Sequence, residues 1–363
     1  MSKRDRRHIA FFVPSLNIGG VESVFLTYSD MLASRGYEVD FVVCKLEGTL
    51  IGKVPNGVNL VHFGGIKLRK VVPYLRHYLK SSEVGTLVCG PDITNFIAVL
   101  VNLSLQSRNR VNLIVTQHSV LDLDAKDIGL LGRIIPLGKR LLYRFASNVL
   151  AVSNAVAVNL IKDGVPKHKI TTIYNPISVE KIERLSIEQC PVDIPTDYVV
   201  FVGRLNRVKN VGLLIKAFEL LVDKTLCLLI VGDGAMRGEW EQMACQSSKC
   251  DKIVFTGSLS NPAPVLRSAR VVAVPSFSEA FPMVVIEAAA LGKTIVHTPN
   301  VGCVEILGTK YGYCSEGFDN PSDFAYTLRR ALDAPIEPEK MKKIALALGE
   351  SEIIPKLEKL LAR

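Results

Sequence analysis

Two glutamates, Glu279 and Glu287, lie eight residues apart in residues 276–292, where a polar loop leads into an apolar, helix-prone segment. If a helix begins near Met283, its first backbone N–H groups and the positive end of its dipole face the same space as the two carboxylates. Amides bind phosphate oxygens, and carboxylates accept hydrogen bonds from hydroxyls. The pattern therefore predicts a site for a ligand that carries both groups, such as a nucleotide sugar.

Two cations follow the strand that we predict at residues 198–202. Arg204 comes just after that strand, and Lys209 lies five residues later, where the next helix is expected. A guanidinium and an ammonium that converge can bind a diphosphate and stabilise the charge that it gains as a leaving group. The alternative is a pair of ordinary surface cations. Arg207, between them, is expected to face solvent.

Glycines follow several other predicted strands. Gly19 and Gly20 lie between the first strand and a helix, and Gly232 and Gly257 stand at the ends of two later strands. Glycine permits positive φ and the close approach of a ligand to the backbone. Plain strand-to-helix turns would show the same glycines, so each of these signals is weak when taken alone.

Polar residues follow two strands in the first half of the chain. His118 comes just past a predicted strand, where it is expected to contact phosphate or sugar, although a lone histidine is more often structural. Thr94 and Asn95 follow another strand and are expected either to meet a substrate or to cap a helix.

Short β-rich runs alternate with helical patterns, which predicts right-handed βαβ units and parallel sheets. In the first half, strands are expected at 8–13, 39–43, 58–63, 86–89, 113–116, 149–152 and 170–174. Helices are expected between them at 21–34, 67–81, 92–106, 127–146 and 154–163. In the second half, strands are expected at 198–202, 226–231, 253–255, 271–274 and 294–297.

A proline-containing stretch of mixed charge, residues 176–197, interrupts this alternation and is interpreted as a linker. The chain is therefore expected to form two doubly wound α/β domains, residues 1–185 and 186–363, with the last helix packing back on the first. Domains of this kind bind ligands at the carboxyl ends of their strands, so we expect them to face each other across a ligand-binding cleft.

Length and composition agree with a two-domain globular protein. The chain has 363 residues, of which 48% are hydrophobic, and its mean hydropathy is +0.26. Apolar runs such as residues 96–105 are shorter than the roughly 18 residues of a membrane span. The basic N-terminal segment leads into residues 9–13 without the long apolar region of a secretory signal, so export is not expected.

The eight cysteines show no CxxC pair and no spacing typical of a metal site. Several stand inside apolar, strand-like runs. We interpret them as reduced, mostly buried thiols of a cytoplasmic protein.

Charge is distributed unevenly along the chain. Residues 1–185 contain 24 Lys and Arg against 14 Asp and Glu, whereas residues 186–363 contain 20 against 21. The basic first half points to an anionic partner, such as a membrane surface, a polyphosphate-linked substrate or nucleic acid. The alternative is a solvated basic face that aids solubility.

Two segments of the first half combine cations with apolar residues. Residues 126–144 interleave the two kinds, and residues 67–80 are also basic. A basic amphipathic segment can lie in an anionic membrane interface. Pro136 and the glycines of the first segment argue against one straight interfacial helix, and a packed core helix with basic edges is the alternative.

The combined motifs resemble those of the retaining GT-B glycosyltransferases of glycosyltransferase family 4, over almost the whole chain. The resemblance is strongest to bacterial members that build surface polysaccharides or lipid-linked oligosaccharides from UDP-sugars. It is carried, in chain order, by Gly19-Gly20, Gln117-His118-Ser119, Val152-Ser153-Asn154, Tyr174-Asn175-Pro176, Gly203-Arg204-Leu205 with Lys209, Gly232-Asp233-Gly234, and Glu279 with Glu287.

The resemblance implies a GT-B fold, with an acceptor-binding domain at 1–185 and a nucleotide-sugar-binding domain at 186–363. It also implies roles for single residues. Arg204 and Lys209 match the pair that binds the donor diphosphate, and Glu287 matches the carboxylate that holds the ribose. Glu279 matches the carboxylate on the transferred sugar. His118 matches a cleft histidine near the donor sugar and phosphate.

Further binding positions follow from the same resemblance. Gly19 and Gly20 match a loop that closes over the diphosphate. The remaining donor-binding positions are Gly232, Gly257, Phe281, Met283 and Val284. Thr94 and Asn95 are the expected acceptor contacts.

The chain departs from the family pattern at Pro282, where many relatives have glycine. Proline has no N–H, so the phosphate must use amides from Met283 onward, and the preferred sugar is less defined than the fold. Asp122 and Asp124 spell the D-x-D motif of metal-dependent transferases, but they lie in a polar loop and are interpreted as chance. The resemblance implies a diphosphate held by cations and a helix dipole, and therefore no metal or cofactor.

We therefore expect a retaining enzyme that moves a hexose or N-acetylhexosamine from a UDP-sugar to a lipid-linked glycan, at the inner face of the cell membrane. The sequence offers no strong enzymic nucleophile, and the resemblance suggests same-face attack assisted by the leaving phosphate. Two rivals remain: a UDP-N-acetylglucosamine epimerase, and a non-catalytic protein that binds membranes or polyanions. Nucleic-acid binding is not expected, because the basic residues lack interleaved aromatic residues.

Overall fold

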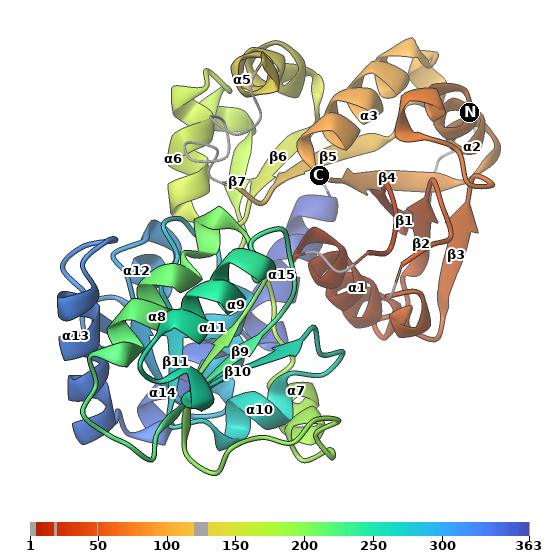
Figure 1. Cartoon of the computed structure of the whole chain (residues 1–363). Coiled ribbons are helices and arrows are strands. Elements are labelled where there is room, and N and C mark those ends of the chain that lie inside the picture. Colours follow the sequence, from red (N-terminus) through yellow and green to blue (C-terminus); the bar gives the residue numbers. More distant parts are fainter. Residues whose placement is uncertain (1–4, 18–19, 49, 120–129, 363) are drawn as a thin grey trace. The chain divides into compact units, whose positions relative to one another are not determined.

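The computed structural model describes residues 5–17, 20–48, 50–119 and 130–362 (Figure 1). The chain divides into two compact units. Unit 1 comprises Met1–Pro176 with Glu350–Arg363, and unit 2 comprises Ile177–Gly349. Within the described residues, unit 1 contains a seven-stranded sheet and unit 2 a six-stranded sheet, both parallel. The predicted α/β class with two doubly wound sheets is confirmed.

The sheet of unit 1 has the strand order β3-β2-β1-β4-β5-β6-β7. The central strands contain continuous buried, mostly apolar runs, such as residues 9–13 of β1, as expected for parallel strands covered on both faces. Ile9 of β1, for example, pairs with Val39 on one side and with Thr86 on the other. The strands are β1 (Asp5–Val13), β2 (Glu38–Val43), β3 (Val58–His62), β4 (Val84–Cys89), β5 (Asn112–Gln117), β6 (Asn148–Ala151) and β7 (Ile170–Thr172).

Helices cover both faces of this sheet. Helices α2, α3 and α5 lie over one face, and α1 and α15 lie over the other (Figure 1). Two rings of α1 pack on Phe11 of β1: Phe25 is tilted against it with centroids 5.1 Å apart, and Tyr28 is stacked on it at 6.4 Å. The helices of unit 1 are α1 (Gly20–Ala33), α2 (Val72–Ser81), α3 (Asp92–Ser104), α5 (Leu130–Leu142), α6 (Asn154–Lys162) and α15 (Glu350–Leu361).

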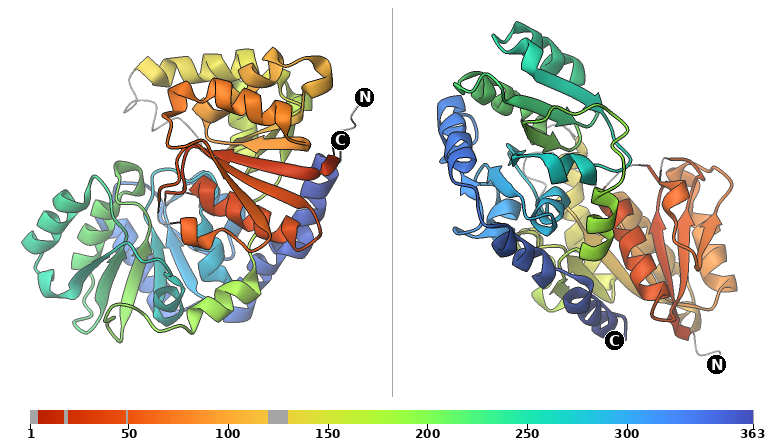
Figure 2. Two further views of the ribbon diagram at one scale, coloured as in Figure 1. Left: turned by 90° about the vertical axis from the view of Figure 1, so that its right-hand side faces the viewer. Right: turned by 90° about the horizontal axis from the view of Figure 1, so that it is seen from below.

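Helix α15, at the end of the chain, packs beside α1 of unit 1 (Figure 2). Its first residue, Glu350, forms an ion pair with Arg35, with Nη1 2.6 Å from Oε1. Asn112 of β5 donates to Leu361 O at 3.4 Å. The chain enters and leaves unit 2 at neighbouring points, because Ile177 N donates to Leu348 O at 3.2 Å.

The sheet of unit 2 has the order β10-β9-β8-β11-β12-β13. Helices α8, α9 and α13 pack together on one side, and α7, α10, α11 and α14 pack together on the other. The strands are β8 (Tyr198–Val202), β9 (Cys227–Val231), β10 (Ile253–Gly257), β11 (Val271–Val274), β12 (Thr294–His297) and β13 (Tyr313–Cys314). The helices are α7 (Val179–Ser186), α8 (Val211–Glu219), α9 (Arg237–Gln246), α10 (Ala263–Ser268), α11 (Met283–Ala290), α12 (Val301–Leu307), α13 (Pro321–Asp333) and α14 (Pro338–Ala347).

The core of unit 2 lies between the sheet and helices α8, α9 and α13. Phe201 of β8, Phe218 of α8 and Trp240 of α9 are all buried there, together with Phe324 of α13. The core positions recur at helical spacing in the helices and at alternate residues in the strands, as with Leu228 and Ile230 of β9. The core fixes the strand ends from which the candidate ligand-binding loops emerge.

The expected linker at 176–197 is wrong over its first part, because residues Val179–Ser186 form α7. Ser178 caps this helix by accepting a hydrogen bond from Lys181 N at 3.3 Å. The helix packs against α10 and α11, so the compact units meet at Pro176 and Ile177 rather than at the expected residues 185 and 186. The prolines on both sides concealed a short amphipathic helix.

Candidate functional site

Lys209 is positioned by a short 3-10 turn that follows β8. The turn η6 spans Arg207–Lys209 and begins after Asn206. The Asn206 side chain caps the turn by accepting a hydrogen bond from Lys209 N at 3.2 Å. This cap fixes the backbone of the turn, and therefore the position from which the Lys209 side chain projects.

Lys209 and Glu279 form an ion pair in which Nζ lies 2.6 Å from Oε1. The same oxygen accepts a hydrogen bond from the buried Ser276 hydroxyl at 2.6 Å. Phe277 N donates to Val208 O at 2.8 Å, which joins the loop after β11 to η6. The side chains of the pair keep 23% and 10% of their surface exposed, so small polar groups can reach them from solvent.

Helix α11 begins four residues after Glu279. Its N-cap residue, Pro282, forms no side-chain cap, and the first amides of a helix have no intrahelical partner. Met283 and Val284 therefore present N–H groups and the positive end of the helix dipole beside the acidic loop. Glu287, one turn further, is partly exposed.

Gly302 lets α12 approach the loop that carries Glu279. A Cβ at Gly302 would lie 2.5 Å from Glu279 O and 2.9 Å from Pro282 Cδ. Thr298 Oγ1, in the turn before α12, donates to Ser276 O. The loop is thus held between η6 on one side and α12 on the other, which fixes the Glu279 carboxylate.

The ends of β8, β9 and β10 approach one another through glycines. Gly232 has φ +143°, and a Cβ there would lie 1.9 Å from Gly203 O. Gly232 N donates to Gly257 O at 2.9 Å, and Gly257 itself has φ +75°. No other residue fits the Gly232 position, so this close approach explains the glycine without requiring a ligand.

The remaining predicted donor-binding side chains of unit 2 differ in exposure. Arg204 is exposed after β8, and Arg207 is exposed as expected. Phe281 is only 7% exposed, so its ring belongs to the packed interior. Asp233, beside Gly232, accepts a hydrogen bond from Gly234 N at 2.7 Å and pairs with Arg237 at 3.1 Å.

His118 follows β5 in unit 1. Its Nε2 lies 3.0 Å from Thr116 Oγ1, and that hydroxyl donates its single proton to Cys89 O at 2.9 Å. The histidine must therefore donate through Nε2–H, which leaves Nδ1 as an acceptor. Burial, with the ring edge against Phe25, lowers the pKa of His118 to about 4, so the imidazole is neutral near neutral pH.

The other predicted residues of unit 1 differ in accessibility. Thr94 and Asn95 are fully buried in α3. Asn95 Nδ2 donates to Thr116 O and to Tyr143 Oη, both at 2.9 Å. Gly20 is exposed at the start of α1. Gly19, Asp122 and Asp124 lie outside the described residues.

Two polar residues that the sequence did not single out belong to these sites. Ser276 contacts Glu279, and its only sequence signal is a hydroxyl three positions before a glutamate. Lys139, in α5, is fully buried between the carboxylates of Asp92 and Asp163. Because apolar residues surround Lys139 in the sequence, the pattern predicted an ordinary cation on an amphipathic helix.

No helix among the described residues combines the length and apolarity needed to cross a lipid bilayer. In the same part of the chain, no group of three or more His, Cys, Asp or Glu side chains is arranged to hold a metal ion.

Two family models match the chain. Residues 18–181 match the model of "Glycosyltransferase Family 4", and residues 188–347 match that of "Glycosyl transferases group 1". The first match covers most of unit 1, and the second covers most of unit 2 together with the Lys209–Glu279 pair.

Individual relatives align over most of the chain. One relative, from Campylobacter jejuni, is 24% identical over 353 residues, covering 92% of both chains. It is named N-acetylgalactosamine-N,N'-diacetylbacillosaminyl-diphospho-undecaprenol 4-alpha-N-acetylgalactosaminyltransferase. A second C. jejuni enzyme is 27% identical over 298 residues, which cover 77% of this chain and 76% of the relative. Its name describes an alpha-1,4-N-acetyl-D-galactosaminyltransferase that acts on a diNAcBac-PP-undecaprenol glycan. The crystal structure of Anabaena HepE with UDP and glucose has a TM-score of 0.81 at 17% identity, covering 98% and 99% of the two chains.

Proposed function

Because the chain belongs to glycosyltransferase family 4, group 1, and is a glycosyltransferase with a GT-B fold that uses a nucleotide-sugar donor, we propose that it moves a hexose or N-acetylhexosamine from a UDP-sugar to a glycan acceptor. The observation that supports this most is the cluster of Lys209, Glu279 and Ser276 beside the start of α11. It combines a cation and free amides for phosphate with a carboxylate for hydroxyls.

In this proposal, unit 2 binds the donor. Arg204, Lys209 and the amides of Met283 and Val284 bind the diphosphate, because all of them offer positive charge or N–H donors. Glu287, one turn into α11, accepts hydrogen bonds from the ribose hydroxyls. Pro282 offers no amide, so the phosphate contacts begin one residue later than a glycine at this position would allow.

The remaining residues orient the transferred sugar. Glu279 Oε1 is held by Lys209 and Ser276, which leaves Oε2 to accept a sugar hydroxyl. His118 Nδ1 is an acceptor in the neutral ring, and we assign it a hydrogen bond from a second hydroxyl of the transferred sugar. Gly19 and Gly20 would cover the diphosphate.

The chemical step is a displacement with retained configuration. The acceptor oxygen forms a bond to the anomeric carbon on the face from which UDP departs, and the bond between that carbon and the phosphate oxygen breaks. The hydroxyl proton of the acceptor moves to an oxygen of the leaving phosphate. Lys209 and the α11 amides stabilise the charge that this phosphate gains.

The relatives suggest a lipid-linked acceptor, because the names of both C. jejuni enzymes specify an undecaprenol-linked diphosphate glycan. Binding to an anionic membrane surface at the inner face of the cell membrane would give access to such an acceptor. Two regions of unit 1 present exposed apolar and basic side chains that suit this role.

The first region is the α2 surface, within residues 64–80, which contain five Lys or Arg and no Asp or Glu. Val72 and Tyr74 are 43% and 46% exposed there, which suits insertion between lipid headgroups. The exposed cations of the α2 surface are Lys67, Arg69, Lys70, Arg76 and Lys80.

The second region is α5, within the segment 126–144 that we had singled out. Pro136 lies inside α5, which runs from Leu130 to Leu142 within the stretch 127–146 where a helix is expected. Its residues Ile134, Leu137 and Leu141 are exposed, as is Phe145 in the 3-10 turn that follows α5. Since α5 exposes fewer cations than the α2 surface, we assign the main membrane contact to the α2 surface.

Ligand binding followed by turnover tests the proposed function. Thermal-shift measurements with UDP-glucose, UDP-galactose, their N-acetylamino counterparts and GDP-mannose identify the donor, and polyprenyl-diphosphate glycans then serve as acceptors. If GDP-mannose stabilises the protein and no UDP-sugar does, the proposed UDP-sugar donor is wrong. Epimerisation of a UDP-sugar in buffer without acceptor would favour the epimerase function. Absence of binding to any nucleotide sugar would favour the non-catalytic function.

A further inference from the structure

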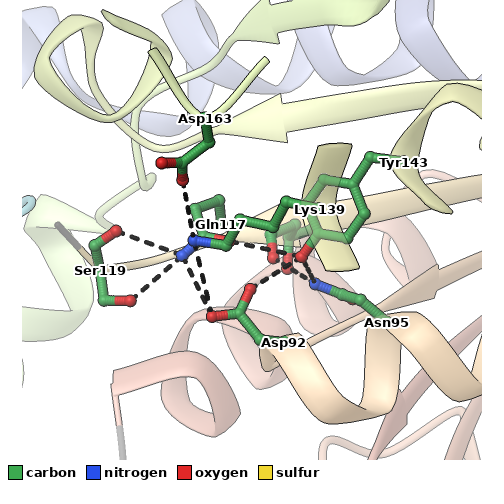
Figure 3. A network of polar contacts seen from close by, with 8 residues as sticks. Asp92, Asn95, Gln117, Ser119, Lys139, Tyr143 and Asp163 are labelled. Carbon is green, nitrogen blue, oxygen red and sulfur yellow. Dashed lines mark hydrogen bonds and ion pairs between the residues drawn. The ribbon is translucent and has the colours of Figure 1, made fainter. Parts of the chain in front are cut away.

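A network of polar side chains lies at the carboxyl ends of β4 and β5 in unit 1 (Figure 3). Asp92, the first residue of α3, accepts a hydrogen bond from Tyr143 Oη at 2.8 Å. Gln117, the last residue of β5, donates from Nε2 to Asp92 Oδ2 at 3.5 Å and to Ser119 Oγ at 3.1 Å. Carboxyl ends of parallel strands are where α/β sheets bind ligands, and the donor-binding residues proposed above do not include this network.

Lys139 is the cation of this network. Its Nζ lies 3.8 Å from Asp92 Oδ2 and 3.6 Å from Asp163 Oδ2, and 1% of its side chain is exposed. Nζ has no hydrogen-bond partner among the described residues. A buried ammonium is costly unless nearby anions compensate for the lost water. The position of Lys139 therefore depends on the two carboxylates, and theirs depends on Lys139.

Asp92 is the carboxylate of this ion cluster that lies at the strand ends, because it is the first residue of α3, the helix after β4. Its side chain is 12% exposed, and that of Asp163, at the end of α6, is 17% exposed. Lys139, Asn95 and Thr94 are fully buried. An ionised carboxylate has about four acceptor positions, and two hydrogen bonds and one distant ammonium leave some of them for a ligand. Of the polar residues at the end of β4, Asp92 is better placed to meet an acceptor than Thr94 or Asn95.

The charges of this region also restrict the ligand. Asp92 and Asp163 carry two negative charges against one positive charge on Lys139, and the neutral His118 adds none. A uronic acid or a phosphate placed against Asp92 meets a like charge, which disfavours binding. A sugar hydroxyl instead donates a charge-assisted hydrogen bond to the same oxygen.

We propose that Asp92 binds a hydroxyl of the acceptor sugar, that Lys139 acts as a positioning residue for its carboxylate, and that the receiving sugar is therefore neutral. This inference rests on the proposed transfer to a glycan acceptor. It concerns only unit 1 and the choice of acceptor. Donor binding therefore tests the proposed function independently of this inference.

The test compares the wild type with Asp92→Asn and Lys139→Met. The acceptor probes are octyl α-N-acetylglucosaminide, octyl α-N-acetylgalactosaminide and octyl α-glucoside as neutral sugars, with octyl α-glucuronide as the acidic one. We expect the wild type to bind at least one neutral probe and to bind the glucuronide roughly tenfold more weakly or worse. Asp92→Asn should raise KM for that neutral probe by about tenfold, because a charge-assisted hydrogen bond becomes a neutral one.

The kinetic pattern separates contact from general destabilisation. In both variants, kcat should change by less than about threefold and the Kd of UDP by less than about twofold, because only acceptor binding is weakened. The double variant Asp92→Asn with Lys139→Met should have the KM of Asp92→Asn alone, since Lys139 acts through Asp92. Asp40→Asn is the matched control, because Asp40 is a buried carboxylate of unit 1 that bonds Asn59 and Tyr78 away from this network.

Three results would overturn the inference. These are an unchanged acceptor KM in a folded Asp92→Asn, equal binding of the glucuronide and the neutral probes, or no neutral probe bound by the wild type. Additive effects in the double variant remove the positioning role of Lys139. If Lys139→Met does not fold, Asp92→Asn still decides the hydroxyl contact. Failure of the proposed function itself appears differently, as a wild-type protein that binds no UDP.

Discussion

Lys209 Nζ lies 2.6 Å from Glu279 Oε1, although the two residues are 70 positions apart in the chain. The pair joins the turn after β8 to the loop before α11, and the Ser276 hydroxyl completes the contact. The cation that we propose for phosphate and the carboxylate that we propose for hydroxyls thus lie in direct contact. Each lowers the charge that the other presents to a ligand until the donor arrives.

Glu279→Gln should separate the two roles of this pair. Glutamine keeps the size of the side chain but releases Lys209 from an ion pair, so UDP should bind as tightly as before or slightly more tightly. Transfer should fall by about 100-fold, because the sugar loses a charged acceptor for its hydroxyl. Calorimetric titration with UDP and steady-state kinetics measure the two effects. Weaker UDP binding together with intact turnover would show that Glu279 does not contact the sugar.

Lys209→Met should have the opposite signature. Loss of a charged hydrogen bond to phosphate should weaken UDP binding by roughly 10- to 100-fold. Arg207→Met is the matched control, since Arg207 is an exposed cation of the same turn and its removal should leave the Kd of UDP within about twofold. Equal losses in both variants would mean that only the general charge of the turn matters.

Gly302→Ala should disturb the Glu279 loop without touching a ligand. The new Cβ would lie 2.5 Å from Glu279 O, so the loop or α12 must shift, at a cost of about 1–3 kcal/mol in the free energy of unfolding. Transfer should fall by about tenfold or more, because catalysis depends on exact placement of the carboxylate.

Gly238→Ala is the control for this substitution. Gly238 lies in α9, and a Cβ there has no atom within 4 Å, so the change should leave activity intact and stabilise unit 2 by up to ~1 kcal/mol. Thermal unfolding, followed by the fluorescence of Trp240 in unit 2, reports stability for both variants. Gly302→Ala with wild-type kinetics would show that the loop tolerates the shift.

The strands could be predicted because each is a short apolar run bounded by polar or glycine residues. β13 was missed, since Tyr313–Cys314 is too short to carry a pattern. Helix α7 was missed because the surrounding prolines outweighed an amphipathic pattern of eight residues. These failures are local, and neither changes the order of the neighbouring strands.

The candidate site could be predicted only in part, for a reason of distance along the chain. Spacing placed Glu279 and Glu287 on one helix start, because they are near in sequence. It could not show that Lys209 meets Glu279, nor that Lys139 is buried between Asp92 and Asp163, since these contacts join separate elements. Contacts between distant segments depend on the packed sheet, which no local pattern encodes.

The α2 surface should bind anionic vesicles through its cations. Arg69→Glu with Lys70→Glu should weaken binding to vesicles rich in phosphatidylglycerol by about 30-fold or more, because each lost cation contributes about 1 kcal/mol. Sedimentation with vesicles measures this, and added salt should weaken the wild-type binding. Lys340→Glu with Lys343→Glu, on exposed residues of α14, is the matched control. Equal losses in both double variants would exclude a specific α2 surface.

His118 should make unit 1 less stable in mild acid. Burial lowers its pKa to about 4, whereas the unfolded chain has a histidine pKa of about 6.5. As pH falls between these values, only the unfolded state binds the proton, so stability decreases, by about 2 kcal/mol at about pH 5. His118→Asn should lose less stability over the same range, and hydrogen exchange of β4 and β5 measures the difference. His297, also buried and with a lowered pKa, is present in both proteins and cancels. Equal acid sensitivity of the two proteins would mean that His118 is not neutral in the folded state.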